Sequence, residues 1–422
     1  MSLYKVADGL LGTNVTWEDV EAEMQKALDT TARFGSDKRV TNIGDMKGFM
    51  SKIALVEPCW VGVEDGKELP ERFTVKISSQ LPFLEMSKLL DFNGNDMLSE
   101  ERIQSMGAMT RMLHNKEAEV YNILAREQHP NIPITKIYSL KAFDDENTLK
   151  AFIISEFIPD VHNIGLHDSI FAEDLLPVVR ATASFSAIGE KLDEEENTFA
   201  CENGSFGIVF QQFLEETTAR KMEAMIRNMF DEEHQEKVEK MLEINRTYYC
   251  TAKMLPRFAS TCEFFGYRPV LTHSDLWSSN ILGTKEDGKF NLKAIIDFQT
   301  VAFTTPAQDI GRLFVTCLTT EERREKADFL IEEYYKTFVK ELDETQVPYT
   351  LQQLKDSYQA YFPLMVMMVL PGIAPLLQHA DVPEEYREIM KKMAMARMVG
   401  LLEDFLTTHE SSMKNFPEYF DV

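Results

Sequence analysis

The spacing of apolar residues changes near residue 160, and this change limits what the chain can fold into. Before it, short segments rich in β-branched and aromatic residues predict strands, and the segment 99–126 has the spacing of a helix. The β-type pattern begins at Val40, and the predicted strands cover 51–64, 72–78, 135–143 and 151–158. Strands interrupted by a single helix predict a small α+β unit with an antiparallel sheet.

A further helix is expected before the sheet. Thr16 followed by Asp19 has the spacing of a capping box, in which each side chain accepts a hydrogen bond from the other residue's backbone N–H. Apolar residues then recur at helical spacing, which predicts a helix that continues to about Ala32.

After residue 160 the pattern becomes helical, with one clear interruption at 271–300. The predicted helices cover 170–196, 206–243, 244–265, 321–342, 350–370 and 383–411. Within the interruption, NIL (280–282) and FNLKAIIDF (290–298) flank Asp287-Gly288, a dipeptide typical of β-hairpin turns. The apolar run 361–370 ends at Pro371-Gly372 and is shorter than the roughly 18 residues of a membrane span, so it predicts a buried helix.

Composition excludes several classes of protein. With 422 residues, 44% of them apolar, the chain can bury the cores of two or three packed units. A net charge of −25 without a Lys/Arg-rich run argues against a nucleic-acid partner. The five cysteines are scattered without a C-x-x-C pair, and the first residues lack the pattern of a signal peptide, which together predict reduced thiols in a cytoplasmic protein.

The segments LTHSDLWSSNIL (271–282) and KAIIDFQ (293–299) carry the strongest chemical signal. They place His273, Asp275, Asn280 and Asp297 in an order that phosphoryl transfer can use. An aspartate can orient the hydroxyl of a substrate, while an asparagine five residues on and a second aspartate after a strand can hold Mg²⁺ through hard oxygen atoms. Any one of these residues alone is more simply a turn former or helix cap, but the complete set favours phosphoryl transfer.

The same segments resemble a known family. The pattern H-x-D-L-W-x-x-N followed by I-I-D-F-Q resembles the ecdysteroid-kinase-like, or CHK-kinase-like, family in its nematode-type branch, within the choline kinase and aminoglycoside phosphotransferase superfamily. The resemblance extends over IGDMKGFMSKIALVEPCW (43–60) and PAQDIGRLF (306–314). It implies a protein-kinase-like bilobal α+β fold, with ATP and two Mg²⁺ between an N-lobe of residues 1–158 and a mainly helical C-lobe of residues 159–422.

The resemblance also implies a role for each residue of the motif. Asp275 would be the catalytic aspartate, and His273 would support the catalytic loop by hydrogen bonding. Asn280 and Asp297 would hold the metal. Asp309 would brace the loop from below, and a role as a helix N-cap is compatible with this.

Two positions in the loop leave alternatives open. Glycine usually follows the histidine in these families, whereas Ser274 stands here. Serine either adopts the required backbone or weakens catalysis, if this position needs a positive φ angle. Trp277 is as compatible with packing beside the loop as with contacting a substrate.

Lys76 lies in a predicted strand, where it can face away from the core that its neighbours enter. The resemblance implies that it is the ATP lysine, although an exposed strand lysine is the alternative. Glu117, in HNKEAEVYNIL (114–124), matches the E-x-x-x-Y pattern of the family and would pair with Lys76 to hold it against the phosphates. Glu119 would take this role if the helix were shifted in register.

The nucleotide contacts are less strongly marked. Gly44 and Gly48 precede the first strands, as in a phosphate-covering loop, but lack the G-x-G-x-x-G pattern, and a plain turn is nearly as good an interpretation. Glu156 and Ile158 lie at the end of the last strand of the predicted N-lobe, where backbone groups of a hinge would bind adenine.

Together these features predict an ATP- and Mg²⁺-dependent kinase that phosphorylates the hydroxyl of a small molecule, a steroid-like alcohol by resemblance, with choline-like or sugar-like acceptors open. The alternative is a pseudokinase that binds a nucleotide or another ligand without turnover, because of Ser274 and the poor glycine loop. A protein kinase is disfavoured because no A-P-E segment follows Asp297. The sequence indicates no oligomeric state.

Overall fold

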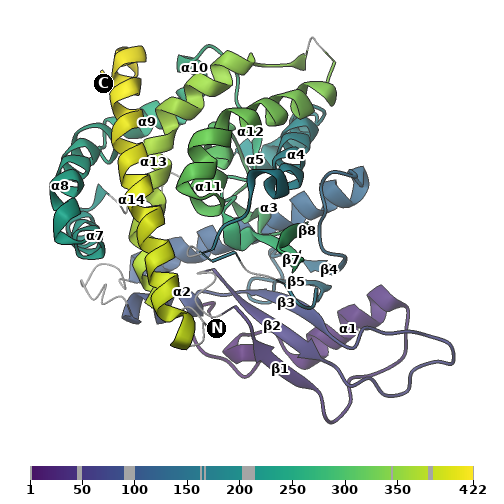
Figure 1. The fold of residues 1–422 in the computed structure, drawn as a ribbon. Coiled ribbons are helices and arrows are strands. Elements are labelled where there is room, and N and C mark those ends of the chain that lie inside the picture. Colours follow the sequence, from purple (N-terminus) through teal and green to yellow (C-terminus); the bar gives the residue numbers. More distant parts are fainter. Residues whose placement is uncertain are drawn as a thin grey trace. The chain divides into compact units, whose positions relative to one another are not determined.

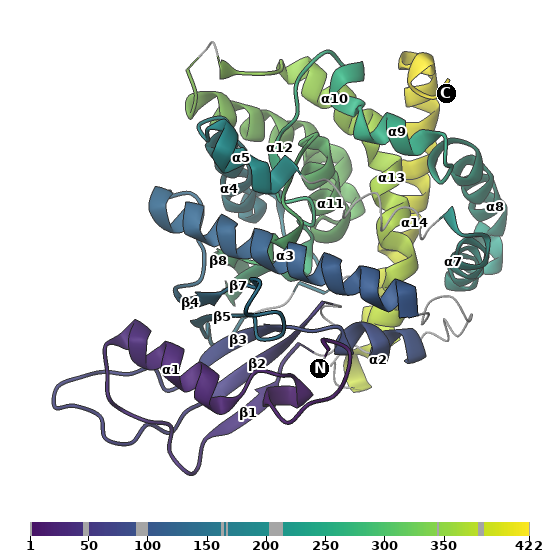
Figure 2. The same ribbon diagram turned by 180° about the vertical axis from the view of Figure 1, so that it is seen from behind.

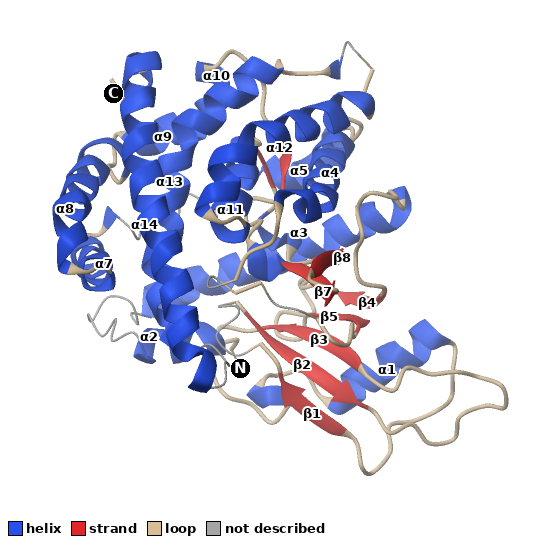
Figure 3. Cartoon of the chain, viewed as in Figure 1, coloured by secondary structure: helices blue, strands red, loops and turns tan. Residues whose placement is uncertain are grey.

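The structure is a computed structural model that describes residues 2–44, 50–89, 100–161, 164–165, 168–201, 214–343, 346–378 and 384–421. It contains two compact units (Figure 1). The first consists of Met1–Gln128 with Ile134–Asp160, and the second of His129–Pro133 with Val161–Val422. Strands dominate the middle of the first unit and helices the second (Figure 3).

The first unit is built on a five-stranded antiparallel sheet in the order β1-β2-β3-β5-β4. The strands are β1 (Arg39–Asn42), β2 (Ser51–Glu57), β3 (Phe73–Ser78), β4 (Ile137–Lys141) and β5 (Phe152–Glu156). The four predicted strands are therefore confirmed with narrower bounds, and the β-type pattern at Val40 belongs to β1. Strand β3 is central, because it pairs with β2 on one side and β5 on the other.

The two faces of this sheet receive different helices. Val75 and Ile77 of β3 are fully buried in a core shared with Val20 and Met24 of α1 (Trp17–Leu28). Because side chains alternate along a strand, Lys76 points to the opposite face, on which α3 (Glu100–Glu127) packs. The long helix predicted over 99–126 is confirmed as α3, which is prominent in Figure 2. A short helix that the sequence pattern did not predict, α2 (Leu81–Leu89), follows β3.

Helix α1 begins as predicted and ends early. Both hydrogen bonds of the capping box between Thr16 and Asp19 are present. The predicted end near Ala32 is wrong, because Asp29 adopts a left-handed conformation (φ 48°) and closes the helix after Leu28. The threonines that follow bind the Glu64 carboxylate instead of continuing the helix, since short polar side chains compete with helical hydrogen bonding.

The second unit is mainly helical. Its helices are α4 (Ala172–Gly189), α5 (Glu194–Cys201), α7 (Glu216–Met229), α8 (Gln235–Ile244), α9 (Met254–Ala259), α10 (Thr261–Phe264), α11 (Ala307–Cys317), α12 (Thr320–Lys340), α13 (Leu351–Gln378) and α14 (Glu384–Asn415). Helix α13 packs against α11 and α14, and both ribbon views show α13 and α14 side by side (Figures 1 and 2). Buried side chains such as Leu364, Met365 and Phe405 form the core of this layer.

Several predicted helix bounds are wrong. Helix α13 continues through Pro371 to Gln378. A proline removes one backbone hydrogen bond, but Ile373 in the next turn is fully buried in the helical core and anchors the continuation. The helix predicted over 206–243 is broken where Phe230 leaves helical geometry and is buried, and its first residues lie outside the described part. The helix predicted over 244–265 is interrupted before Met254.

Two short strand pairs fix the segment 271–300. Strand β6 (Val270–Thr272) pairs with β9 (Ala302–Thr304), so both ends of the segment are tied together. Between them, β7 (Ile281–Glu286) and β8 (Lys289–Ile295) form the predicted hairpin. Its turn residues Asp287 and Gly288 both have positive φ angles, which explains the choice of Asp-Gly. Helix α4 packs closely on β6, since a Cβ atom at Gly189 would lie 2.3 Å from the Cβ of Leu271.

The predicted fold class is confirmed. An antiparallel sheet carries a lysine on its central strand opposite a long helix, and a mainly helical unit contains a loop followed by a hairpin, which is the arrangement of a protein-kinase-like α+β fold. Among the described residues, no helix has the length and apolar character needed to cross a membrane.

Candidate active site

In the first unit, the lysine of β3 meets the glutamate of α3. Lys76 Nζ lies 2.6 Å from Glu117 Oε2, and the Glu117 side chain is only 1% exposed. Glu119, the alternative partner, is exposed and instead accepts a hydrogen bond from Asn122. A charged pair of this geometry holds the ammonium group in one position, as a phosphate-binding lysine requires.

His114 lies one turn before Glu117 and ties α3 to the sheet. Its Nε2 lies 3.0 Å from the carbonyl oxygen of Lys141 in β4, and its Nδ1 lies 2.7 Å from Ser78 Oγ in β3. Because a carbonyl can only accept, Nε2 carries the proton and Nδ1 accepts from the serine. Burial lowers the pKa of His114 to about 4, so the ring is neutral near pH 7. This contact fixes the part of α3 that presents Glu117.

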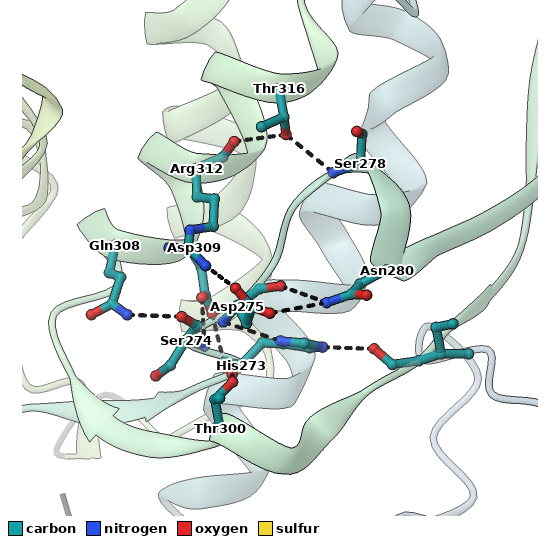
Figure 4. A network of polar contacts seen from close by, with 11 residues as sticks. His273, Ser274, Asp275, Ser278, Asn280, Thr300, Gln308, Asp309, Arg312 and Thr316 are labelled. Atoms are coloured by element: carbon teal, nitrogen blue, oxygen red, sulfur yellow. Dashed lines mark hydrogen bonds and ion pairs between the residues drawn. The ribbon is translucent and has the colours of Figure 1, made fainter. Parts of the chain in front are cut away.

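In the second unit, Asp309 organises the loop after β6. Its two carboxylate oxygens accept the backbone N–H groups of His273 (2.7 Å) and Ser274 (2.8 Å), as Figure 4 shows. Burial raises the pKa of Asp309 to about 7, while these two hydrogen bonds oppose the rise by favouring the charged form. Asp309 lies in the first turn of α11, whose N-cap is Pro306, so the expected N-cap role is wrong.

His273 links the loop to the end of β8. Its Nε2 lies 3.0 Å from the carbonyl oxygen of Ile296, and its Nδ1 accepts the backbone N–H of Asp275 at 3.3 Å. Burial lowers the pKa of His273 to about 4, and its ring centroid lies 4.9 Å from that of Phe298. The neutral imidazole thus acts as a fixed spacer between the segment that carries Asp275 and the segment that carries Asp297.

Ser274 adopts a positive φ angle, which answers whether serine can take the backbone conformation expected of a glycine here. Its φ is 64°, in the left-handed region that favours glycine. Three hydrogen bonds hold the residue there: its N–H to Asp309, its carbonyl from Gln308 Nε2 at 2.9 Å, and its hydroxyl with that of Thr272 at 2.8 Å. The cost of such a conformation is of order 1–3 kcal/mol, and these contacts offset it.

The next part of the loop brings Asp275 and Asn280 together. Asn280 Nδ2 donates to the backbone oxygen of Asp275 at 2.8 Å and lies 3.5 Å from its Oδ2. Trp277 between them is half-buried. Asp297 follows Ile296, whose N–H donates to the backbone oxygen of Asn280 at 3.1 Å. Backbone contacts therefore connect both predicted metal ligands to one loop.

These residues fit Mg²⁺ by their chemistry. The Asn280 amide nitrogen donates to the backbone oxygen of Asp275, so the amide oxygen is the atom that could bind a cation, and Asp297 supplies a carboxylate. Within the described ranges, no group of three or more His, Cys, Asp or Glu residues could hold a metal. A small set of oxygen donors suits Mg²⁺, which usually binds one or two carboxylates together with water and substrate phosphates.

An arginine that the sequence analysis did not single out pairs with Asp275. Arg312 Nη1 donates to Asp275 Oδ1 in an ion pair, and the two side chains are 16% and 28% exposed. Burial lowers the pKa of Arg312 to about 10, which leaves it charged at neutral pH. Figure 4 shows its side chain extending from α11 towards Asp275. The available signal was its spacing, three residues after Asp309, which places both on one face of the helix.

The predicted nucleotide contacts are only partly described. A Cβ atom at Gly44 would lie 2.6 Å from Cγ1 of Ile53, so close packing requires this glycine. Gly48 lies outside the described residues. Glu156 ends β5, and its carboxylate accepts the N–H of Lys136 at 2.9 Å. Ile158 is half-buried just beyond the strand. Contacts of these residues with a nucleotide stay predictions.

Comparison with known proteins places the chain in a family. A family model described as "Uncharacterized oxidoreductase dhs-27" matches residues 3–413. The chain belongs to this family, DUF1679. A segment of 100 residues of this DUF1679 member, 24% of the chain, is 36% identical to the "Uncharacterized kinase-like protein D1044.1" of Caenorhabditis elegans and spans only 26% of that protein.

Solved structures similar to this DUF1679 member include a choline kinase from Cryptosporidium parvum (12% identity, TM-score 0.47, 92% of this chain and 94% of the other). A spectinomycin phosphotransferase in complex with ADP and spectinomycin shares 10% identity, with a TM-score of 0.47 over 94% and 99% of the two chains. A microcompartment-associated aminopropanol kinase shares 13% identity, with a TM-score of 0.41 over 92% and 98%. Assignment to the ecdysteroid-kinase-like branch stays a prediction.

Proposed function

We propose that this DUF1679 protein is an ATP-dependent kinase that transfers the γ-phosphoryl group to a hydroxyl of a small molecule. The observation that carries the proposal is the loop from His273 to Asn280, in which Asp309 clamps the backbone and Asn280 binds the segment that presents Asp275. A catalytic aspartate and a metal-binding asparagine at this spacing are what phosphoryl transfer needs.

Each residue has a defined task in the proposed reaction. Asp275 orients the acceptor hydroxyl and accepts its proton, while Asn280 and Asp297 hold Mg²⁺. When bound there, Mg²⁺ would neutralise negative charge on the phosphate groups. Lys76, held by Glu117, binds the phosphates of ATP. Most of the catalysis then comes from positioning and from stabilising charge, because phosphoryl transfer needs little covalent help from the protein.

The short connection between Asp297 and helix α11 favours a small molecule as the acceptor. It passes through β9 and reaches helix α11 at Ala307. A protein kinase places an activation loop at this point to hold a peptide. Several proteins similar to this chain carry names of kinases for small molecules, which agrees with the proposal. The steroid-like acceptor suggested by resemblance stays a prediction.

Hydride transfer, which the family's description as an oxidoreductase suggests, has less support. A nicotinamide dinucleotide usually binds at the carboxyl edge of a parallel sheet, at a glycine-rich turn. In the ranges that the structure describes, every strand pairing is antiparallel. We therefore do not assign a dinucleotide site to this chain.

Calorimetric titration with Mg²⁺–ATP tests the proposal without knowledge of the acceptor. The wild type should bind, and Asp297→Ala should lose most of the affinity because a metal ligand is removed. Glu286→Ala is the matched control, since Glu286 is an exposed acid on the same hairpin. A folded wild type that does not bind Mg²⁺–ATP, or equal affinity in all three proteins, would contradict the assignment.

A further inference from the structure

The ion pair between Arg312 and Asp275 bears on which acceptors the proposed kinase can use. An acceptor hydroxyl must come within about 3 Å of the Asp275 carboxylate to be oriented by it. Arg312 donates to one oxygen of that same carboxylate, so the reacting hydroxyl would lie within about 6 Å of the guanidinium group. Any charge on the acceptor close to its hydroxyl therefore interacts with Arg312 at short range.

Arg312 also changes the charge of the catalytic loop. An unpaired Asp275 would attract a positively charged acceptor, but Arg312 neutralises it. The neighbouring carboxylates have other tasks. Asp309 is buried and receives two backbone N–H groups, and Asp297 is assigned to the metal. The loop thus offers a cation little attraction, and it places a guanidinium group on the side of Asp275 Oδ1.

We propose that Arg312 selects for alcohols that carry no positive charge near the hydroxyl and disfavours amino alcohols and quaternary ammonium alcohols. This inference rests on the proposed kinase function and narrows its substrate class. It also separates this chain from enzymes of choline and aminopropanol, whose acceptors carry a positive charge beside the hydroxyl-bearing carbons.

The test uses two alcohols of the same shape, choline and 3,3-dimethylbutan-1-ol, in which a carbon replaces the charged nitrogen. ADP production at saturating Mg²⁺–ATP gives kcat/KM for each alcohol. The wild type should prefer the neutral alcohol by at least tenfold. A tenfold preference corresponds to about 1.4 kcal/mol.

Two variants separate charge from structural support. Arg312→Gln should reduce the preference for the neutral alcohol at least tenfold or invert it, because the cation is removed while a polar group remains beside Asp275. Arg312→Lys keeps the charge and should keep the preference. The ratio between two alcohols measured in one protein does not depend on how much of that protein is active, so a merely structural role would leave the ratio unchanged.

A wild type that uses choline as well as its neutral counterpart would overturn the inference. An unchanged ratio in Arg312→Gln would also overturn it. Failure of the kinase function itself is distinguished by the absence of ADP production with every alcohol tested, whether or not Mg²⁺–ATP binds.

Discussion

Each unit of the molecule contains an ion pair at a predicted functional residue. The two pairs differ in whether the acid or the base is the more buried, supporting partner. In the first unit the acid is the support: Glu117 is 1% exposed and holds the more accessible Lys76. In the second unit the base is the support: Arg312 is 16% exposed and holds the more accessible Asp275. In each pair the more buried partner positions the one that is proposed to meet substrate.

This difference teaches how the two pairs should respond to mutation. A buried charge that loses its partner is costly, because it has been removed from water without compensation. Glu117 would be left in that position if Lys76 were removed, whereas Asp275 is open enough to be solvated. The first pair should therefore matter more for stability, and the second pair should matter more for chemistry.

The largest expected effect on stability comes from breaking the first pair. Lys76→Met should lower the free energy of unfolding by about 3–5 kcal/mol, because the buried Glu117 carboxylate loses its ion pair with Lys76. The double variant Lys76→Met with Glu117→Gln should recover part of this loss, as urea denaturation can measure. Glu119→Gln is the matched control and should change stability by less than about 0.5 kcal/mol. If Lys76→Met were as stable as the double variant, the buried charge of Glu117 would not be the cause of the loss.

A second prediction concerns the histidine that supports the first pair. The folded-state pKa of His114, about 4, lies below the ordinary value of 6.5, so the unfolded chain binds more protons between these values. Stability from this group is complete above about pH 6.5 and is lost as pH falls towards 4. Between pH 7 and pH 5 the loss should be about 2 kcal/mol. His114→Gln should flatten the dependence on pH. An equally steep dependence of stability on pH in the His114→Gln variant would show that other groups cause it.

Breaking the second pair should cost less stability than breaking the first. Arg312→Gln should lower the free energy of unfolding by about 1–2 kcal/mol, since Asp275 is 28% exposed and keeps contact with Asn280. Urea denaturation beside Lys76→Met gives the comparison directly. A loss as large as that of Lys76→Met would mean that the two pairs do not differ as proposed.

The smallest expected effect concerns the strained residue beside Asp275. Ser274→Ala keeps the left-handed backbone and loses the hydroxyl contact with Thr272, so it should be destabilising by about 1 kcal/mol. Ser274→Gly loses the same contact but removes the strain, and should be about 1 kcal/mol more stable than the alanine variant. Thermal unfolding of the two variants measures this difference. If the alanine variant were as stable as the glycine variant, the backbone at residue 274 would not be strained.

The sequence predicted features that depend on neighbours along the chain. Thr16 and Asp19 marked a helix start, Asp287-Gly288 marked a hairpin turn, and the spacing of 99–126 predicted the helix that carries Glu117. The period of two in β3 correctly indicated that Lys76 faces away from the core. Each of these features depends on residues that are neighbours in the sequence, so the sequence alone was sufficient to predict it.

The remaining features depend on packing between distant segments. Arg312 contacts Asp275 because the loop is clamped to the first turn of α11. The spacing from Asp309 to Arg312 places both on one helix face, but it does not encode a contact across 37 residues. Helix α13 continues past Pro371 because burial of Ile373 outweighs one lost hydrogen bond. Ser274 was recognised as unusual, but its positive φ angle became evident only from the backbone. Tertiary context decided each of these cases.

The most direct test of the central claim is ADP production from Mg²⁺–ATP with a panel of small neutral alcohols, in the wild type and in Asp275→Asn. The wild type should turn over with at least one alcohol. The variant should bind Mg²⁺–ATP with similar affinity and lose at least about 100-fold in rate, because the group that accepts the hydroxyl proton is gone. Equal rates in both proteins would contradict the role of Asp275, and binding without turnover in the wild type would favour the pseudokinase alternative.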